Sequence, residues 1–177
     1  MRTACLIPIV LPCCLPGCGD ENLSGSQAAG QMDAADTPLA RPEAAVEAYL
    51  DAMRRREAHA DLPMLSSDSR ALMKSWNVRP QQMAAMVSAY QACNAEPALI
   101  DPEGALAVVR YPRDEHNCSP WFLIREGEEW RLDLAAGQRI IRFGRDNAWR
   151  FDTAQLAQSP FAFAFSDWEF DGNGRPR

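Results

Sequence analysis

The sequence predicts an α+β fold in which N-terminal helices pack against a curved antiparallel sheet, followed by a C-terminal extension. Two observations lead to this prediction. Apolar residues recur at helical spacing between residues 42 and 92. After Cys93, short apolar stretches that alternate with polar residues are separated by turns containing Pro and Gly, which is typical of strands. At 177 residues, of which 47% are hydrophobic and 24% charged, the chain has room for one globular domain with short appendages.

The first 17 residues are typical of a signal peptide. Arg2 is the only charged residue before Asp20, and the uncharged stretch between them is shorter than the roughly 20 apolar residues of a membrane-spanning helix. Prolines at positions 8, 12 and 16 would also interrupt a long helix. Residues 18–37 are small and polar without apolar periodicity, which predicts a flexible tether with a reach of roughly 25 Å.

Residues 15–18, Leu-Pro-Gly-Cys, resemble the lipobox of bacterial lipoproteins. In that motif a small residue precedes a cysteine that is acylated and becomes the new N-terminus, and Pro16 departs from the Ala, Ser or Thr that is usual at its position. The resemblance implies that residues 1–17 are removed and that Cys18 carries a lipid, which holds the domain at the bacterial cell envelope facing the periplasm. Position 19, where Asp would favour the inner membrane, is Gly, which favours the outer membrane over the inner. The alternative is an ordinary secretory signal that is cleaved nearby.

The cysteines agree with export to an oxidising compartment. Three of the six lie in the segment expected to be removed, and Cys18 would be acylated. Cys93 and Cys118 remain as an even pair, which predicts a disulfide that closes a loop of about 25 residues and contributes on the order of 3 kcal/mol. Two free, buried thiols are the alternative.

Three helices are expected in the first half of the domain: from Pro42 to about His59, near Ser67–Ser75 with Ser67 or Asp68 as its cap, and from Pro80 to about Ala92. The first carries apolar residues at i, i+3, i+4 and i+7, which predicts one buried stripe formed by Val46, Tyr49, Leu50 and Met53. Arg54–Arg56 fall in its last turns, where cations interact favourably with the helix dipole.

Four strands are expected after Cys93: Glu96–Ile100, Ala105–Tyr111, Ser119–Arg125 and Glu129–Ala135. In the last strand the apolar residues alternate with Arg131 and Asp133, which predicts an antiparallel meander with one packed and one polar face. Residues 139–143 are compatible with helix or strand. Phe161–Phe165 is expected to form a final strand before a turn at Asp171–Gly174.

The helix over residues 42–53 and the hairpin over residues 121–134 resemble the nuclear transport factor 2-like superfamily, a cone-like fold in which a bent sheet wraps around a long N-terminal helix. The resemblance covers about residues 40–143 and implies that residues 38–143 form the α+β domain. Residues 144–177 lie outside it and are expected to form a C-terminal extension packed on the same domain.

Some members of that superfamily are enzymes, and such chemistry needs a carboxylate and a hydrogen-bond donor in an apolar pocket. Asp133 with Tyr49 or Tyr111 is the candidate pocket set in this chain, although these residues match no family motif. The two histidines, His59 and His116, form no recognisable metal set with the scattered carboxylates. The sequence also lacks a phosphate-binding glycine-rich loop and a nucleophile elbow. We therefore expect no catalytic residues, no metal and no cofactor.

The net charge of −6 argues against nucleic acid as a partner, because phosphate binding requires clustered cations. The one local basic cluster suits anionic lipid headgroups or an acidic partner, or else pairing with surface carboxylates; it comprises Arg139, Arg142, Arg145 and Arg150. The observations together favour a membrane-anchored envelope lipoprotein that acts as a non-enzymatic binding or assembly module for a partner protein or a small apolar ligand. One alternative is a small-molecule carrier, or an isomerase- or hydrolase-type enzyme, that uses the interior of the cone. Another is a structural component of the envelope.

Overall fold

Residues 39–144 and 148–177 are described by the structure, a computed structural model. The predicted signal peptide (1–17), the tether (18–37) and Cys18 lie outside the described residues, as does Arg145 of the basic cluster. Within the described ranges, none of the helices is both long enough and apolar enough to cross a membrane.

Three helices precede the sheet, as predicted: α1 (Pro42–Arg54), α2 (Ser67–Met73) and α3 (Pro80–Gln91). Both α1 and α3 begin at a proline, whose fixed φ suits the first helical turn and whose missing N–H costs nothing there. The cap of α2 is Ser66 rather than Ser67 or Asp68, since the Ser66 side chain accepts a hydrogen bond from the backbone N–H of Ser69.

The first helix ends earlier than the sequence suggested, at Arg54 instead of near His59. Arg56 adopts a φ of 62°. Its N–H donates to the carbonyl of Met53, and the next N–H, of Glu57, donates to the carbonyl of Ala52. This is the Schellman pattern of helix termination, with arginine in the left-handed position that glycine usually takes. The helix therefore stops because local hydrogen bonds close its last turn.

The sheet has four antiparallel strands in the order β1-β2-β3-β4, which confirms the α+β fold. The strands are β1 (Leu99–Ile100), β2 (Leu106–Val109), β3 (Trp121–Glu126) and β4 (Glu129–Leu132). Gly104 and Gly127 adopt φ values of 71° and 65° in the turns that connect β1 to β2 and β3 to β4. β4 ends three residues before the predicted Ala135, because Asp133 caps a helix that begins at Leu134.

The chain after the sheet forms α4 (Leu134–Ile140), β5 (Ile141–Phe143), β6 (Trp149–Phe151), α5 (Thr153–Gln158) and the 3₁₀ helix η2 (Pro160–Phe165). β5 and β6 pair as a separate two-stranded sheet. Of residues 139–143, which were compatible with helix or strand, the first two end α4 and the last three form β5. The prediction of a strand at Phe161–Phe165 is wrong. A proline begins this segment, the Ser159 hydroxyl accepts the N–H of Phe161, and the buried residues recur at helical rather than alternating spacing.

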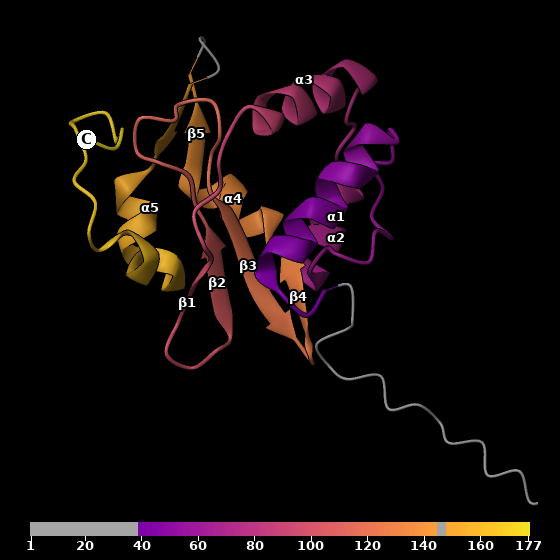
Figure 1. The fold of residues 1–177 in the computed structure, drawn as a ribbon, viewed down its shortest axis with the longest axis horizontal. Helices are drawn as coiled ribbons and strands as arrows, with labels where there is room; N and C mark the ends of the chain where they lie inside the picture. Colours follow the sequence, from indigo (N-terminus) through magenta and orange to yellow (C-terminus); the bar gives the residue numbers. More distant parts are fainter. Residues whose placement is uncertain (1–38, 145–147) are drawn as a thin grey trace, which may run out of the picture. The chain divides into compact units, whose positions relative to one another are not determined.

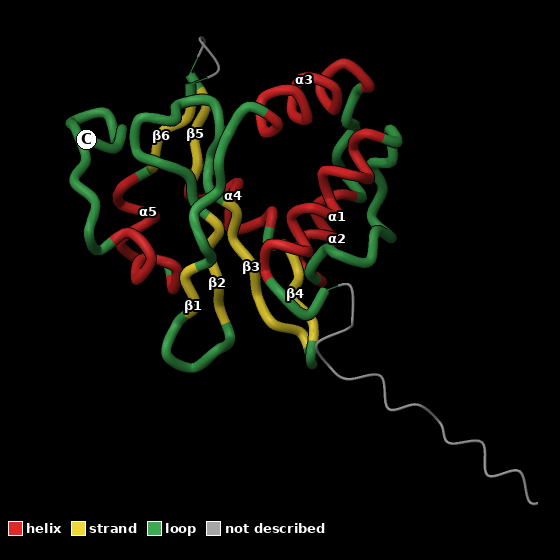
Figure 2. The backbone as a smooth tube through the Cα atoms, in the orientation of Figure 1, coloured by secondary structure: helices red, strands yellow, loops and turns green. Residues whose placement is uncertain are grey.

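The core is divided between the two faces of the four-stranded sheet. Ala107 and Trp121 belong to a cluster that α1, α2 and α3 cover, whereas Val108 and Phe122 belong to a second cluster. The second cluster is completed by α4, β5, β6, α5 and η2. Figure 1 and Figure 2 show the sheet lying between these two groups of elements. The alternation predicted for the last strand is present in β4, where Trp130 and Leu132 are buried and Glu129 and Arg131 are only partly buried. In β2 and β3 consecutive residues are buried, because elements after the sheet supply apolar side chains that cover the second face.

Arg110, directly after β2, ties the C-terminal segment to the sheet. Its side chain is only 14% exposed and donates to the carboxylates of Glu96 at 2.7 Å and Asp167 at 2.8 Å. The guanidinium carbon also lies 5.3 Å from the centre of the Trp168 ring, within the range of a cation–π interaction. The hydrogen bond from Arg110 holds the pKa of the Asp167 carboxyl below its usual value.

Candidate functional site

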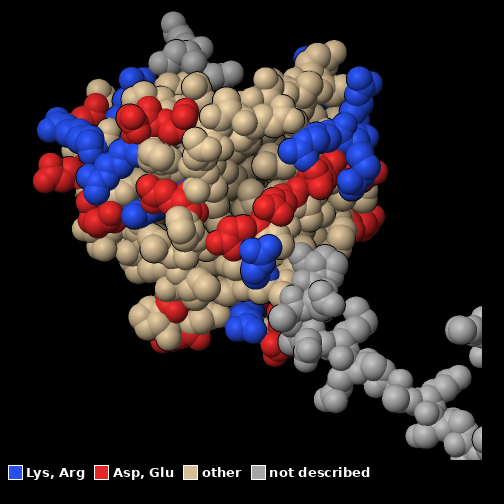
Figure 3. All heavy atoms as spheres, viewed as in Figure 1, with Lys and Arg blue, Asp and Glu red and all other residues tan. Residues whose placement is uncertain are grey.

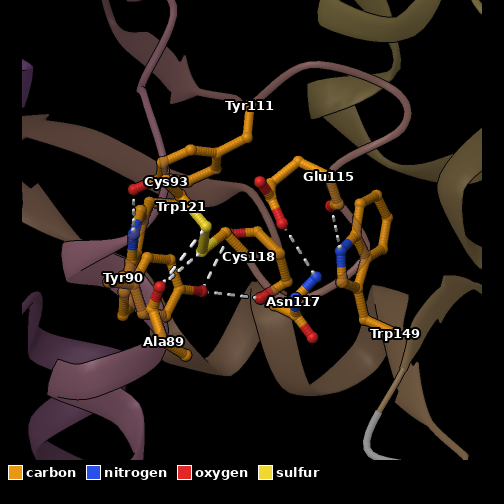
Figure 4. The surroundings of a disulfide bond; sticks show 10 residues. Ala89, Tyr90, Cys93, Tyr111, Glu115, Asn117, Cys118, Trp121 and Trp149 are labelled. Carbon is orange, nitrogen blue, oxygen red and sulfur yellow. Dashed lines mark hydrogen bonds between the residues drawn. A yellow bond between two sulfur atoms is a disulfide. The ribbon is translucent and has the colours of Figure 1, made fainter.

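The predicted disulfide between Cys93 and Cys118 is formed, so the alternative of two free thiols is excluded in this structure. It joins the residues just after α3 to the long loop between β2 and β3, as Figure 4 shows. The Cys118 side chain is fully buried, and both sulfur atoms lie 3.4 Å from the carbonyl oxygen of Ala89. The same loop is held on its other side by the Trp149 indole N–H, which donates to the Glu115 carbonyl at 3.3 Å. The bridge is thus a structural element that positions this loop.

The two tyrosines of the candidate pocket set are part of the same core cluster. Tyr49 and Tyr111 are 2% and 4% exposed. Tyr49 packs edge-on against Trp121 at 5.6 Å between ring centres, and the Trp121 indole N–H donates to the Tyr111 hydroxyl at 3.2 Å. Tyr90 contacts both Tyr111 and Trp121 (Figure 4). Tyr49 and Tyr111 therefore belong to a packed group of aromatic rings.

Burial raises the pKa of these phenols above their usual value of 10.0. It raises the pKa of Tyr49 and of Tyr111 to about 12, and it raises the pKa of Tyr90 further. The Tyr90 hydroxyl lies 2.9 Å from both the carbonyl oxygen and the hydroxyl of Ser119. The hydroxyls of Tyr90 and Tyr111 make internal hydrogen bonds, which suits a structural role rather than proton transfer.

Asp133 lies apart from the tyrosines, on the side of the sheet that faces the second core cluster. One oxygen of its carboxylate accepts the backbone N–H of Ala136 at 2.9 Å and so caps α4. The side chain is 7% exposed, and burial raises the pKa of its carboxyl, while the hydrogen bond from Ala136 and the positive charge of Arg139 oppose the rise. The structure therefore does not bring Asp133 together with Tyr49 or Tyr111.

Asp133 instead lines a half-open pocket of about 270 Å³ between β2, β3, α4, α5 and the start of η2. Its apolar side includes Leu106 and Ile124, which are cross-strand partners, and Phe161. Its polar side includes Asp133, Arg139 and Gln155. The volume lies just below the range of about 300–1,000 Å³ that is common for small-molecule sites. A carboxylate and a guanidinium next to an apolar wall can orient a small ligand that has one polar end.

Sequence reasoning found Asp133 but missed the other residues of this pocket. Arg139 was assigned to a surface basic cluster, Gln155 lies in the extension where no element was predicted, and Phe161 was expected to belong to a strand. The one available signal was the helix-forming run of small and apolar residues directly after Asp133, which is typical of a helix preceded by its cap. Across the described part of the chain, His, Cys, Asp and Glu side chains form no group of three or more that could hold a metal ion.

Acidic and basic side chains lie next to one another on the face of the molecule shown in Figure 3.

No family model matches the chain, and neither a curated protein nor a solved structure matches it. The interpretation of the pocket therefore depends on its own geometry.

Proposed function

We propose that this protein is a membrane-anchored envelope lipoprotein whose folded domain is a non-enzymatic binding module for a small ligand. The proposed lipid anchor is supported by the lipobox-like residues 15–18, which follow an apolar stretch of signal-peptide length. The disulfide supports export, because such bridges persist mainly in oxidising compartments. The Asp133 pocket is the observation that carries the binding role.

Binding is favoured over catalysis because the pocket carboxylate already has a structural partner. A general base needs access to the proton it removes and a second group that stabilises the developing charge. The Asp133 carboxylate caps α4, and the tyrosines that would serve as donors lie in the other core cluster. The same pocket is lined by apolar residues together with a few polar ones, which is the composition of many small-molecule sites. The preferred ligand is small and largely apolar, with one polar or charged end.

The pocket can be tested with two small aromatic probes of opposite charge, benzamidine and benzoate, titrated into the full chain and followed by NMR. We expect Asp133→Asn to weaken the binding of benzamidine and Arg139→Gln to weaken the binding of benzoate, since each removes the matching charge. Asp51→Asn is the control, because it removes a carboxylate on α1 that pairs with Arg54 and lies outside this pocket. Probes that fail to bind, or that bind all variants equally, would contradict the proposal.

The anchor can be tested independently by mass spectrometry of the mature protein from a bacterial host. We expect an N-terminal cysteine at position 18 that carries acyl chains, and co-sedimentation with the outer membrane. Cys18→Ser should release the protein from the membrane fraction, since it removes the thiol that is acylated. A mature product that retains an intact peptide across residues 15–18 would contradict the lipoprotein assignment.

Membership of the nuclear transport factor 2-like superfamily stays a proposal. It is supported by α1, which contacts β2 and β4, and by the β3–β4 hairpin at residues 121–132. The superfamily cone requires a sheet that bends around α1. An experimental structure in which the sheet is open and does not curve around this helix would contradict the relation.

A further inference from the structure

The register of the β5–β6 hairpin places two arginines directly opposite each other. Arg142 pairs with Arg150 across the two strands, and both side chains are exposed, whereas the flanking residues Ile141 and Phe151 are buried. Like charges directly opposite in an antiparallel pair are destabilising. A negatively charged group that contacts both arginines would remove this repulsion.

The protein supplies only part of that neutralisation. Arg142 donates to the Asp152 carboxylate at 3.1 Å and to the carbonyls of Gln138 and Ile141, which orients its guanidinium. Asp152 is itself shared, because its other oxygen accepts the backbone N–H of Gln155. The Arg150 side chain makes no hydrogen bond or ion pair with any residue of the described ranges. The pair therefore keeps a net positive charge within a chain whose net charge is −6.

Both arginines line an open cleft of about 440 Å³ on the outer side of the hairpin. The cleft is also lined by Asp152, Thr153 and the loop Gly172–Gly174. The loop is held close to β6, because the Phe151 N–H donates to the Gly174 carbonyl at 2.8 Å. Gly174 is required there, since its φ is +81° and a Cβ would lie 2.0 Å from the Phe151 carbonyl oxygen. The cleft is thus formed by the fold rather than by mobile side chains alone.

We infer that this cleft binds a phosphate-type anion, with the paired guanidiniums of Arg142 and Arg150 as its principal donors. Guanidinium groups present several N–H donors in a planar fork that matches phosphate geometry. Thr153 and Asn173 also line the cleft, and both carry side chains that can donate a hydrogen bond. The same chemistry is offered by a phospholipid headgroup and by a free phosphate-bearing molecule. The inference is independent of the Asp133 pocket, which lies elsewhere.

The test uses the full chain with Cys18→Ser, so that no acyl chain contributes, at low ionic strength where electrostatic binding is least screened. Inorganic phosphate is titrated by calorimetry into this protein and into the same protein carrying Arg150→Gln or Arg150→Lys. Arg56→Gln is the matched control, because it removes one exposed arginine at the end of α1, outside the cleft. We expect Arg150→Gln to weaken phosphate binding at least tenfold, Arg150→Lys to weaken it less, and Arg56→Gln to leave it unchanged.

A second arm identifies the source of the phosphate. Vesicles of phosphatidylcholine with phosphatidylglycerol are compared with vesicles of phosphatidylcholine alone, using the same variants, so that the shared N-terminus contributes equally. Binding to the anionic vesicles that depends on Arg150 supports a lipid headgroup as the ligand. Phosphate binding that depends on Arg150 without such vesicle binding supports a free phosphate-bearing ligand. If inorganic phosphate does not bind, or binds the variants of Arg150 and Arg56 equally, the inference is overturned.

Discussion

Removal of the Cys93–Cys118 bridge should destabilise the domain mainly by freeing its unfolded chain. The bridge joins residues 25 positions apart in the sequence. The chain-entropy treatment of a closed loop of that length gives about 3.5 kcal/mol at 25 °C. In a domain of this size, such a loss lowers the melting temperature by about 10–14 °C. The native contacts around the loop, such as the hydrogen bond between Tyr90 and Ser119, are expected to persist in the reduced protein.

The assay compares urea-induced unfolding of the wild-type chain with and without reductant, followed by the fluorescence of its five tryptophans. Reduction leaves both sulfur atoms in place. Substitution of the fully buried Cys118 would also remove core atoms. The double variant Cys93→Ala/Cys118→Ala is therefore used only as a control for effects of reductant on the other cysteines. A reductant effect on the wild type below about 1 kcal/mol, or an equal effect on the double variant, would refute the loop-closure reasoning.

Three further predictions concern single side chains, each measured by urea unfolding. Gly174→Ala should cost about 2–4 kcal/mol, because the residue has a φ of +81° and the added Cβ meets a backbone oxygen at 2.0 Å. Gly172→Ala, whose Cβ has open space, should change stability by less than about 0.5 kcal/mol, and equal losses in both variants would count against the argument. Ser69→Ala should cost about 1–3 kcal/mol, since this fully buried hydroxyl donates to the carbonyl of Leu132 and accepts the N–H of Leu134, and a loss within measurement error would contradict it. Burial raises the pKa of the Asp133 carboxyl above its usual 3.8. The protonated carboxyl therefore adds to the free energy of unfolding, and this contribution is fully present below pH 3.8 and is lost as pH rises through the folded-state pKa. Asp133→Asn keeps a capping side chain, so we expect the variant to be at least as stable as the wild type at pH 7 and to lack the loss of stability with rising pH. A variant that is destabilised relative to the wild type more at pH 7 than at pH 4 would contradict this prediction.

Local patterns predicted the helices well because their signals lie within a few residues of one another. Val46, Tyr49 and Met53 are buried in α1 as their spacing indicated, whereas Leu50 is only partly buried. The prolines at positions 42 and 80 begin their helices. The errors occurred where two local signals compete. Asp133 continued the alternation of β4, yet its carboxylate caps the next helix, and capping ended the strand. The alternating Phe and Ala residues after Pro160 suggested a strand, but proline and the Ser159 cap favour a helical turn.

The sequence by itself determined the α+β class, the order of helices before the meander and the pairing of Cys93 with Cys118. These features depend on the spacing of apolar residues, on turn residues and on an even number of remaining cysteines, which can be recognised without knowing the long-range contacts of the fold. Only the tertiary structure decided which face of each strand was covered and which side chains share a pocket. Neighbouring strand residues such as Trp121 and Phe122 point to opposite faces, and both are buried because a segment distant in sequence covers the second face. The same long-range packing placed Asp133 away from Tyr49 and Tyr111, and it brought the C-terminal loop Gly172–Gly174 beside Arg142 and Arg150.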